Sequence, residues 1–155
     1  MVRRFLLPLL LVAALLLPRW ATAHDLFPGF LELEASGPSN YQMLWKLPLL
    51  QGQELPIAPR FPDDCALNGD WATRREARAL VYRAQLRCRE PLEGRAISID
   101  GLAGAGTEVL LRVKAWQTDS PQTLLIQPER PSAVIPTASE ADAQPGAWSY
   151  LRLGI

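Results

Sequence analysis

The sequence is poor in the residues that usually carry out chemistry, because its 155 residues include one histidine and two cysteines. The histidine, His24, lies near the N-terminus, so no second histidine completes a two-histidine metal site. No serine lies in the G-x-S-x-G pattern of a hydrolase nucleophile. The composition excludes serine-hydrolase chemistry and predicts a protein that is not an enzyme.

Apolar runs are short, and the run at the N-terminus has the features of an export signal. Arg3 and Arg4 precede an apolar stretch over residues 5–17, and Ala21-Thr22-Ala23 forms a small-x-small cleavage pattern. A membrane-spanning helix needs roughly twenty apolar residues, and this stretch is too short for one. We therefore expect residues 1–23 to be a signal peptide and the mature chain to begin at His24. The protein should be periplasmic or lie at the extracytoplasmic face of the cytoplasmic membrane.

The sequence has no excess of charge of either sign, with 16 basic and 16 acidic residues. Removal of the signal takes away three arginines and no acid, which leaves the mature chain mildly acidic. The basic residues that remain form no stripe or cluster of the kind that binds phosphate backbones. Nucleic acid is therefore excluded as an expected partner.

The two cysteines, Cys65 and Cys88, are expected to form a disulfide. A lone cysteine pair in an exported chain is typical of a disulfide and not of a metal site. Closing a loop of about 24 residues stabilises a fold by roughly 3.5 kcal/mol in the chain-entropy model. This pair is therefore predicted to be structural.

Apolar residues recur at every second position from residue 29 onward, in short runs that end at Gly, Pro, Asn or Asp, which indicates strands and turns. The clearest run predicts a strand with one face made of Leu80, Tyr82, Ala84, Leu86 and Cys88. Residues 31–35, 41–47 and 109–115 alternate in the same way. Shorter candidate strands are residues 53–58, 96–101, 122–127 and 132–136. Half-buried antiparallel strands at this spacing predict an all-β, two-sheet antiparallel β-sandwich of immunoglobulin-like type.

The predicted sandwich covers residues 24–136 and is followed by a change of pattern. Residues 137–146 are small, polar and acidic, which predicts a linker. Residues 147–155 are apolar at helical spacing, which predicts a short helical segment at the start of a membrane-proximal helix. Trp148 and Tyr150 in that segment are aromatic residues of the kind that lie at membrane interfaces.

The predicted N-terminus of the mature chain offers one candidate metal site. Cleavage before His24 would free its α-amine, and the amine and imidazole together could chelate nickel or copper. Asp25 could add an oxygen ligand, with a further carboxylate such as Glu32. The alternative is that His24 is merely the solvated residue that follows the signal, so no cofactor is certain.

An ordered set of segments resembles the start of HupE/UreJ family proteins. The segments are residues 24–34 (H-D-L-F-P-G-F-L-E-L-E), 41–48 (Y-Q-M-L-W-K-L-P), 61–65 (F-P-D-D-C), Cys88, 97–102 (I-S-I-D-G-L) and 150–155 (Y-L-R-L-G-I). The resemblance implies an extracytoplasmic domain that in the family runs into membrane helices implicated in nickel handling for hydrogenase and urease maturation. Those helices are absent here, so no transport residue can be placed on this chain.

Three functions remain open from the sequence. The first is a non-catalytic accessory domain for nickel or related metal uptake, which contacts membrane helices of the same or a neighbouring protein. The second is a stand-alone exported metal-binding module that uses His24. The third is a protein-interaction β-sandwich with no metal role.

Overall fold

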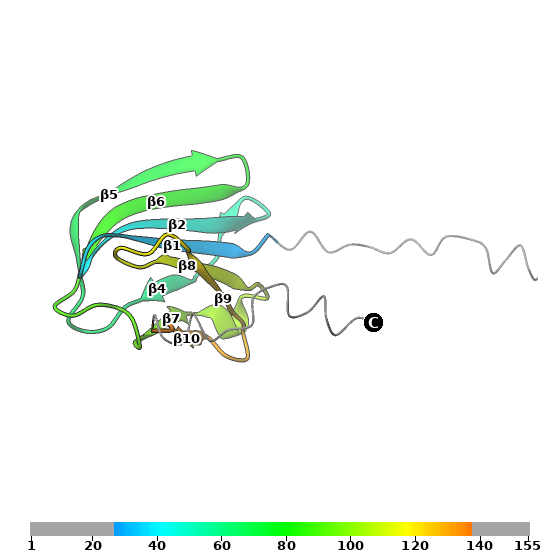
Figure 1. Cartoon of the computed structure of the whole chain (residues 1–155). Helices are drawn as coiled ribbons and strands as arrows, with labels where there is room; N and C mark the ends of the chain where they lie inside the picture. The colour runs from blue at the N-terminus through cyan, green and yellow to red at the C-terminus, as the bar shows by residue number, and fades with distance from the viewer. Residues whose placement is uncertain (1–26, 138–155) are drawn as a thin grey trace, which may run out of the picture.

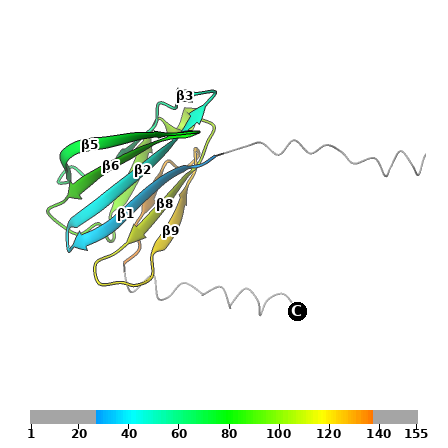
Figure 2. The ribbon, with the colours of Figure 1, turned by 90° about the horizontal axis from the view of Figure 1, so that it is seen from above.

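The computed structural model describes residues 27–137, which form two β-sheets packed against each other (Figures 1 and 2). The larger sheet is seven-stranded, in the order β5-β6-β2-β1-β8-β9 with β3 beside β2. Its strands are β1 (Gly29–Gly37), β2 (Asn40–Leu50), β3 (Gln53–Glu54), β5 (Ala66–Glu76), β6 (Ala79–Arg87), β8 (Val109–Lys114) and β9 (Gln122–Ile126). The smaller sheet has the order β10-β7-β4, from β4 (Ala58–Arg60), β7 (Ala96–Asp100) and β10 (Ser132–Val134). The two-sheet, all-β prediction is confirmed.

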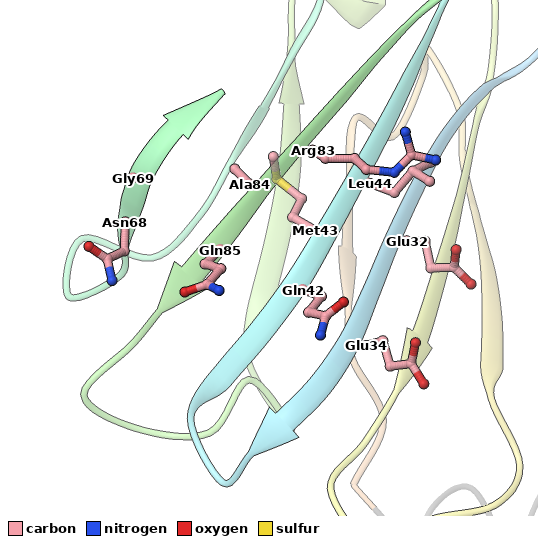
Figure 3. Close-up of a pocket in the computed structure, with 10 residues that line it drawn as sticks. All are labelled: Glu32, Glu34, Gln42, Met43, Leu44, Asn68, Gly69, Arg83, Ala84 and Gln85. Atoms are coloured by element: carbon pink, nitrogen blue, oxygen red, sulfur yellow. The ribbon is translucent and has the colours of Figure 1, made fainter. Parts of the chain in front are cut away.

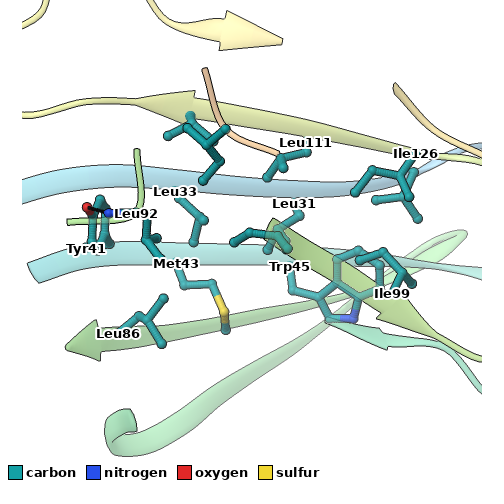
Figure 4. Close-up of a cluster of buried hydrophobic side chains, with 14 of the residues drawn as sticks. Leu31, Leu33, Tyr41, Met43, Trp45, Leu86, Leu92, Ile99, Leu111 and Ile126 are labelled. Carbon is teal, nitrogen blue, oxygen red and sulfur yellow. Dashed lines mark hydrogen bonds between the residues drawn. The ribbon is translucent and has the colours of Figure 1, made fainter. Parts of the chain in front are cut away.

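The core lies between the two sheets and includes the side chains that the alternating pattern placed inward, together with loop residues such as Leu92 and Leu102 (Figure 4). Leu31 and Leu33 of β1 are fully buried, and Trp45 of β2 is 2% exposed. Side chains of a strand point to opposite faces in turn, so alternate apolar residues share the covered face. The smaller sheet covers them with residues such as Ile97 and Ile99 of β7. The strands predicted over residues 31–35, 41–47, 80–88 and 109–115 are confirmed.

The larger sheet is mixed, which corrects the prediction of a purely antiparallel sandwich. β1 pairs with β2 in antiparallel register but with β8 in parallel register, with Leu31 opposite Leu111. β8 follows β7 of the smaller sheet, so the chain enters the larger sheet by a crossover and not by a hairpin. A crossover of this kind allows a strand to run parallel to its neighbour. The strand order does not establish an immunoglobulin-like topology.

The segment predicted as one strand over residues 53–58 is divided between the two sheets. β3 pairs with β2, whereas β4 pairs with β7. Pro56 lies between them and has no backbone N–H for a sheet. The segment therefore crosses from one sheet to the other.

The glycine-rich segment after β7, residues 101–106, connects the two sheets and forms no hairpin. It contains a short 3₁₀ turn (Leu102–Gly104) that leads from the smaller sheet into β8. Gly101 before it has a φ of 77°, and a Cβ there would overlap the carbonyl of Pro56. Glycine is required at this point because the two crossing segments touch through their backbones.

Strand β5 was not predicted from the sequence. Its residues show no alternation of apolar and polar side chains, and its exposed residues include Trp71, Arg74 and Arg75. It forms one edge of the larger sheet and is hydrogen-bonded only to β6. An edge strand needs one neighbour and little burial, so its sequence carries a weak pattern.

Candidate functional site

Several residues predicted to be functional lie outside the described part of the chain. These are His24 and Asp25 of the candidate metal site, and Trp148 and Tyr150 of the predicted membrane-interface segment. Residues 27–137 contain no group of three or more His, Cys, Asp or Glu side chains that could hold a metal ion. In the same range, no helix is long and apolar enough to cross a membrane. Glu32, the further carboxylate considered above, lies instead 3.3 Å from Arg112 across the sheet.

The predicted disulfide between Cys65 and Cys88 is present, and neither cysteine is free. It joins the start of β5 to the end of β6, with the two Cα atoms 3.9 Å apart. Cys88 is buried in the core, as the alternation of its strand predicted. The bond therefore ties the exposed edge strand to the sandwich.

Two polar contacts hold the loop after Cys88. Arg95 forms a bidentate pair with Asp64, and one of its nitrogens lies 3.0 Å from Asp64 Oδ2. The hydrogen bond from Arg95 holds the pKa of the Asp64 carboxyl well below its usual value. The Asp64 side chain is only 22% exposed. No pattern in the sequence marks Arg95 as the partner of Asp64.

Tyr41, a core residue, also holds the loop after Cys88 through its hydroxyl group. Its hydroxyl accepts a hydrogen bond of 2.9 Å from the backbone N–H of Leu92 and lies 3.5 Å from the carbonyl of Pro38. Burial raises the pKa of the Tyr41 hydroxyl. The perturbed groups at this end of the sandwich thus hold the structure together and do not line an open site.

The outward face of the larger sheet carries a polar hollow of about 650 Å³ (Figure 3). One row of side chains across it runs from β5 to β1, through Asn68, Gln85, Gln42 and Glu34. The neighbouring row includes Arg83, Leu44 and Glu32. These rows follow from the register, because residues directly opposite each other on neighbouring strands share a face.

The hollow offers hydrogen bonds and no nucleophile. Its acids are paired with cations of β8, because Glu34 lies 3.0 Å from Lys114 and Glu32 lies near Arg112. The amides of Gln42 and Gln85 can each donate and accept hydrogen bonds. The residues that line it include no serine, cysteine or histidine. This arrangement can hold a polar surface or ligand by contact.

A second feature of this face is an apolar row that the sequence analysis did not detect. Phe30 of β1 lies opposite Leu110 of β8, which lies opposite Leu125 of β9. All three point away from the core, because their chain neighbours Leu31, Leu111 and Ile126 are buried inward. We call Phe30, Leu110 and Leu125 the outward apolar row. Leu125 is 48% exposed.

A small groove of about 300 Å³ includes Lys46, the register neighbour of Phe30, in its lining. Phe27, Pro28 and Pro48 contribute to its walls. The guanidinium of Arg78 lies 5.0 Å from the centre of the Phe27 ring. Lys46, the neighbour of Phe30 in the register, is paired with Glu76 at 2.8 Å. Charged side chains thus flank the apolar surface.

Comparison with known proteins assigns no family to the chain. No protein-family model matches it. No curated protein matches it significantly. The resemblance to HupE/UreJ proteins therefore stays a prediction from the sequence.

Proposed function

We propose that this chain is an exported, non-catalytic accessory domain that contacts membrane helices of a HupE/UreJ-type protein. In this role it assists the uptake of nickel or a related metal, and it works at the extracytoplasmic face of the membrane. The proposal rests on the ordered resemblance of the sequence segments and on one feature of the fold, the outward apolar row.

The outward apolar row supports a docking role because the open face of a sandwich sheet is ordinarily polar. Here Phe30, Leu110 and Leu125 are adjacent across three strands on that face. Contiguous exposed apolar side chains with a polar rim are typical of interaction sites. Apolar helix ends with polar flanks are a suitable partner for such a surface, and the family resemblance supplies such helices.

The proposal treats nickel as cargo that the described domain does not itself enclose. Any direct contact with the metal is assigned to His24 and Asp25 at the predicted mature N-terminus. The immunoglobulin-like class of the sandwich, the linker at residues 137–146 and the helical segment at residues 147–155 belong to the same proposal. The polar hollow beside the row would provide hydrogen bonds at the edge of the contact.

Nickel uptake by the host that carries the gene tests the proposal. Deletion of the gene should lower uptake of radioactive nickel at limiting nickel concentration, and the wild-type gene should restore it. Leu125→Lys should restore uptake poorly because it places a charge in the row. Val134→Lys is the matched control, because Val134 is 59% exposed but lies on β10 of the smaller sheet.

The possible outcomes test the accessory role in nickel uptake and the outward apolar row as the contact surface separately. Unchanged uptake after deletion would rule out the accessory role and leave an interaction domain with no metal function. If deletion lowers nickel uptake but Leu125→Lys restores it as well as Val134→Lys does, the accessory role is retained. The outward apolar row is then rejected as the contact surface. Equal melting temperatures of the two purified variants would ensure that they are compared as folded proteins.

The predicted cleavage before His24 favours a second candidate, a metal-binding module that acts alone. Calorimetry with Ni²⁺ on the processed chain, on His24→Ala and on a chain with one extra N-terminal residue tests it. Binding should be lost in both altered chains, because each disrupts chelation by the α-amine and imidazole. Equal affinity in all three would reject the terminal site.

A further inference from the structure

A groove at the β5 edge lies between the larger sheet and the segment that crosses to the smaller one. Its volume is about 390 Å³, within the usual range of small-ligand sites. Trp71 and Tyr82 lie on one side, and Trp45 contributes from the core. Pro56 lies between β3 and β4, and Pro59 lies on β4. This aromatic groove is separate from the polar hollow and from the outward apolar row.

A bulge in β5 places Trp71 in the aromatic groove. Asn68 lies opposite Gln85 and Ala72 lies opposite Arg83, so residues 69–71 of β5 face the single residue Ala84. Gly69 permits the bulge because its φ is 87°, which side chains other than glycine rarely adopt. Bulges often redirect side chains at sheet edges and next to binding sites.

The rings of Trp71 and Tyr82 form two walls at right angles. Their centres are 5.6 Å apart and their planes meet at 87°. Trp71 is nevertheless 41% exposed, so core side chains do not cover the ring pair completely. The two rings meet edge to face, and the exposed part of Trp71 leaves aromatic surface open at the groove.

The charge of the aromatic groove has one sign. Glu54 carries the only formal charge at neutral pH among the residues that line it, and none of them is basic. The Tyr82 hydroxyl lies 3.4 Å from Glu54 Oε2, which fixes the carboxylate beside the ring. Burial and the nearby Glu54 raise the pKa of Tyr82, so its ring remains uncharged.

We propose that the aromatic groove binds a small organic cation, an ammonium group substituted with methyl or other alkyl groups. Aromatic faces attract such cations, and a carboxylate nearby adds to the attraction. Alkyl groups match the apolar walls, whereas a bare ammonium is strongly hydrated and would lose that water on entry. The inference is independent of the proposed role in metal uptake.

Titration of the processed chain with tetramethylammonium chloride, at ionic strength held constant with sodium chloride, tests this inference. The indole N–H signals in a ¹H–¹⁵N NMR spectrum report binding, and the signal absent from Trp71→Ala identifies Trp71. That signal should shift saturably. Choline should act in the same way, whereas 3,3-dimethyl-1-butanol, which has the shape of choline without the charge, should bind at least about tenfold more weakly.

Variants identify which groups bind the cation. Glu54→Gln keeps the shape of the side chain and should weaken binding about tenfold because it removes the charge. Trp71→Ala should weaken it comparably. Tyr82→Phe should have a smaller effect, because the ring remains while the hydroxyl that holds Glu54 is lost. Glu129→Gln and Trp116→Ala are matched controls at exposed positions outside the groove and should bind as the wild type does.

Three results would overturn the inference. The first is the absence of a saturable shift at up to about 100 mM ligand, where a Kd of about 10 mM would be evident. The second is equal binding of the neutral alcohol, which would make the groove merely apolar. The third is a shift of the same signal with protein concentration alone, which would show that a second copy of the chain covers the groove.

Discussion

The centre of the larger sheet and its β5 edge have the same strand geometry but differ in what covers them. In β1, β2 and β8 the inward side chains are buried beneath the smaller sheet, as Leu31, Trp45 and Leu111 illustrate. In β5 most side chains are exposed, and its large aromatic residue, Trp71, retains 41% of its accessible surface. Burial therefore depends on position beneath the second sheet and not on strand formation.

This difference suggests that stability and recognition are separated in the molecule. Buried apolar area supplies most of the free energy of folding, so the centre should carry it. The edge buries little apolar area. Exposed aromatic and charged groups there therefore lower the free energy of unfolding only slightly. The disulfide adds a covalent link to the β5–β6 strand pairing, because it joins the start of β5 to the end of β6 beside the core.

The largest expected effect is that of a cavity in the centre. Trp45→Ala should lower the free energy of unfolding by about 4 kcal/mol, because a large buried ring is lost and the surrounding side chains only partly collapse. Urea denaturation followed by far-ultraviolet circular dichroism measures this. Trp116→Ala, at a 43% exposed position, is the control and should change the value by less than about 0.5 kcal/mol. A similar loss in both variants would contradict the assignment of the core.

The second effect concerns the link between centre and edge. Replacing both Cys65 and Cys88 with alanine should lower the free energy of unfolding by about 3.5 kcal/mol, through the greater entropy of the unfolded chain. Urea denaturation of the variant and of the reduced wild-type protein should agree. Thiol titration of the denatured, unreduced wild type should find no free thiol, and two free thiols per chain would contradict the pairing.

The third effect is a dependence of stability on pH at the same end of the molecule. Because Arg95 lowers the pKa of Asp64 in the folded state, the contribution of this pair is present above the unfolded pKa of about 3.9. It is lost as the pH falls below that value toward the folded pKa. Asp64→Asn should therefore be less stable than the wild type at pH 7, and the difference should shrink below pH 4.

Thermal unfolding from pH 7 to pH 2 measures this dependence. Glu76→Gln is a suitable comparison, because the hydrogen bond from Lys46 also lowers the pKa of Glu76 but the Glu76 side chain is 42% exposed. Its effect should be smaller, since exposed ion pairs are screened by solvent. A pH-independent difference between Asp64→Asn and the wild type would show that the pair does not act through its charge.

The smallest effect is expected at the edge itself. Trp71→Ala should lower the free energy of unfolding by less than about 1 kcal/mol, because the side chain keeps 41% of its accessible surface and loses an edge-to-face contact with Tyr82. The same urea denaturation measures it beside Trp45→Ala. A loss near that of Trp45→Ala would mean that the β5 edge is part of the core, and the separation drawn above would fail.

The alternating segments of the sequence determined most of the strands and the identity of the core. Residues such as Leu31, Met43 and Leu86 could be assigned inward because a strand buries every second side chain against one apolar layer. The cysteine pair was likewise predictable from the expected export of the chain and from the absence of other cysteines in the sequence. Sequence analysis failed where a strand has little to bury, as in β5, whose exposed residues give no period of two.

Most of the candidate surfaces could not be predicted from the sequence. Phe30, Leu110 and Leu125 are distant along the chain and become neighbours only through the parallel pairing of β1 with β8 and the next pairing with β9. Glu54 and Tyr82 meet because β3 and β6 both pair with β2. Asp64 and Arg95 pair across two loops that the disulfide holds together.

The sequence by itself predicted an all-β fold over residues 24–136 with a disulfide, because period-two burial and the pairing of two lone cysteines are local or compositional properties. Only the tertiary structure decided the strand order, the mixed character of the larger sheet and the groups that share a surface. The physical reason is that strand pairing joins segments far apart in the chain through backbone hydrogen bonds. Those bonds are chemically alike in every strand and leave no mark in the side-chain pattern.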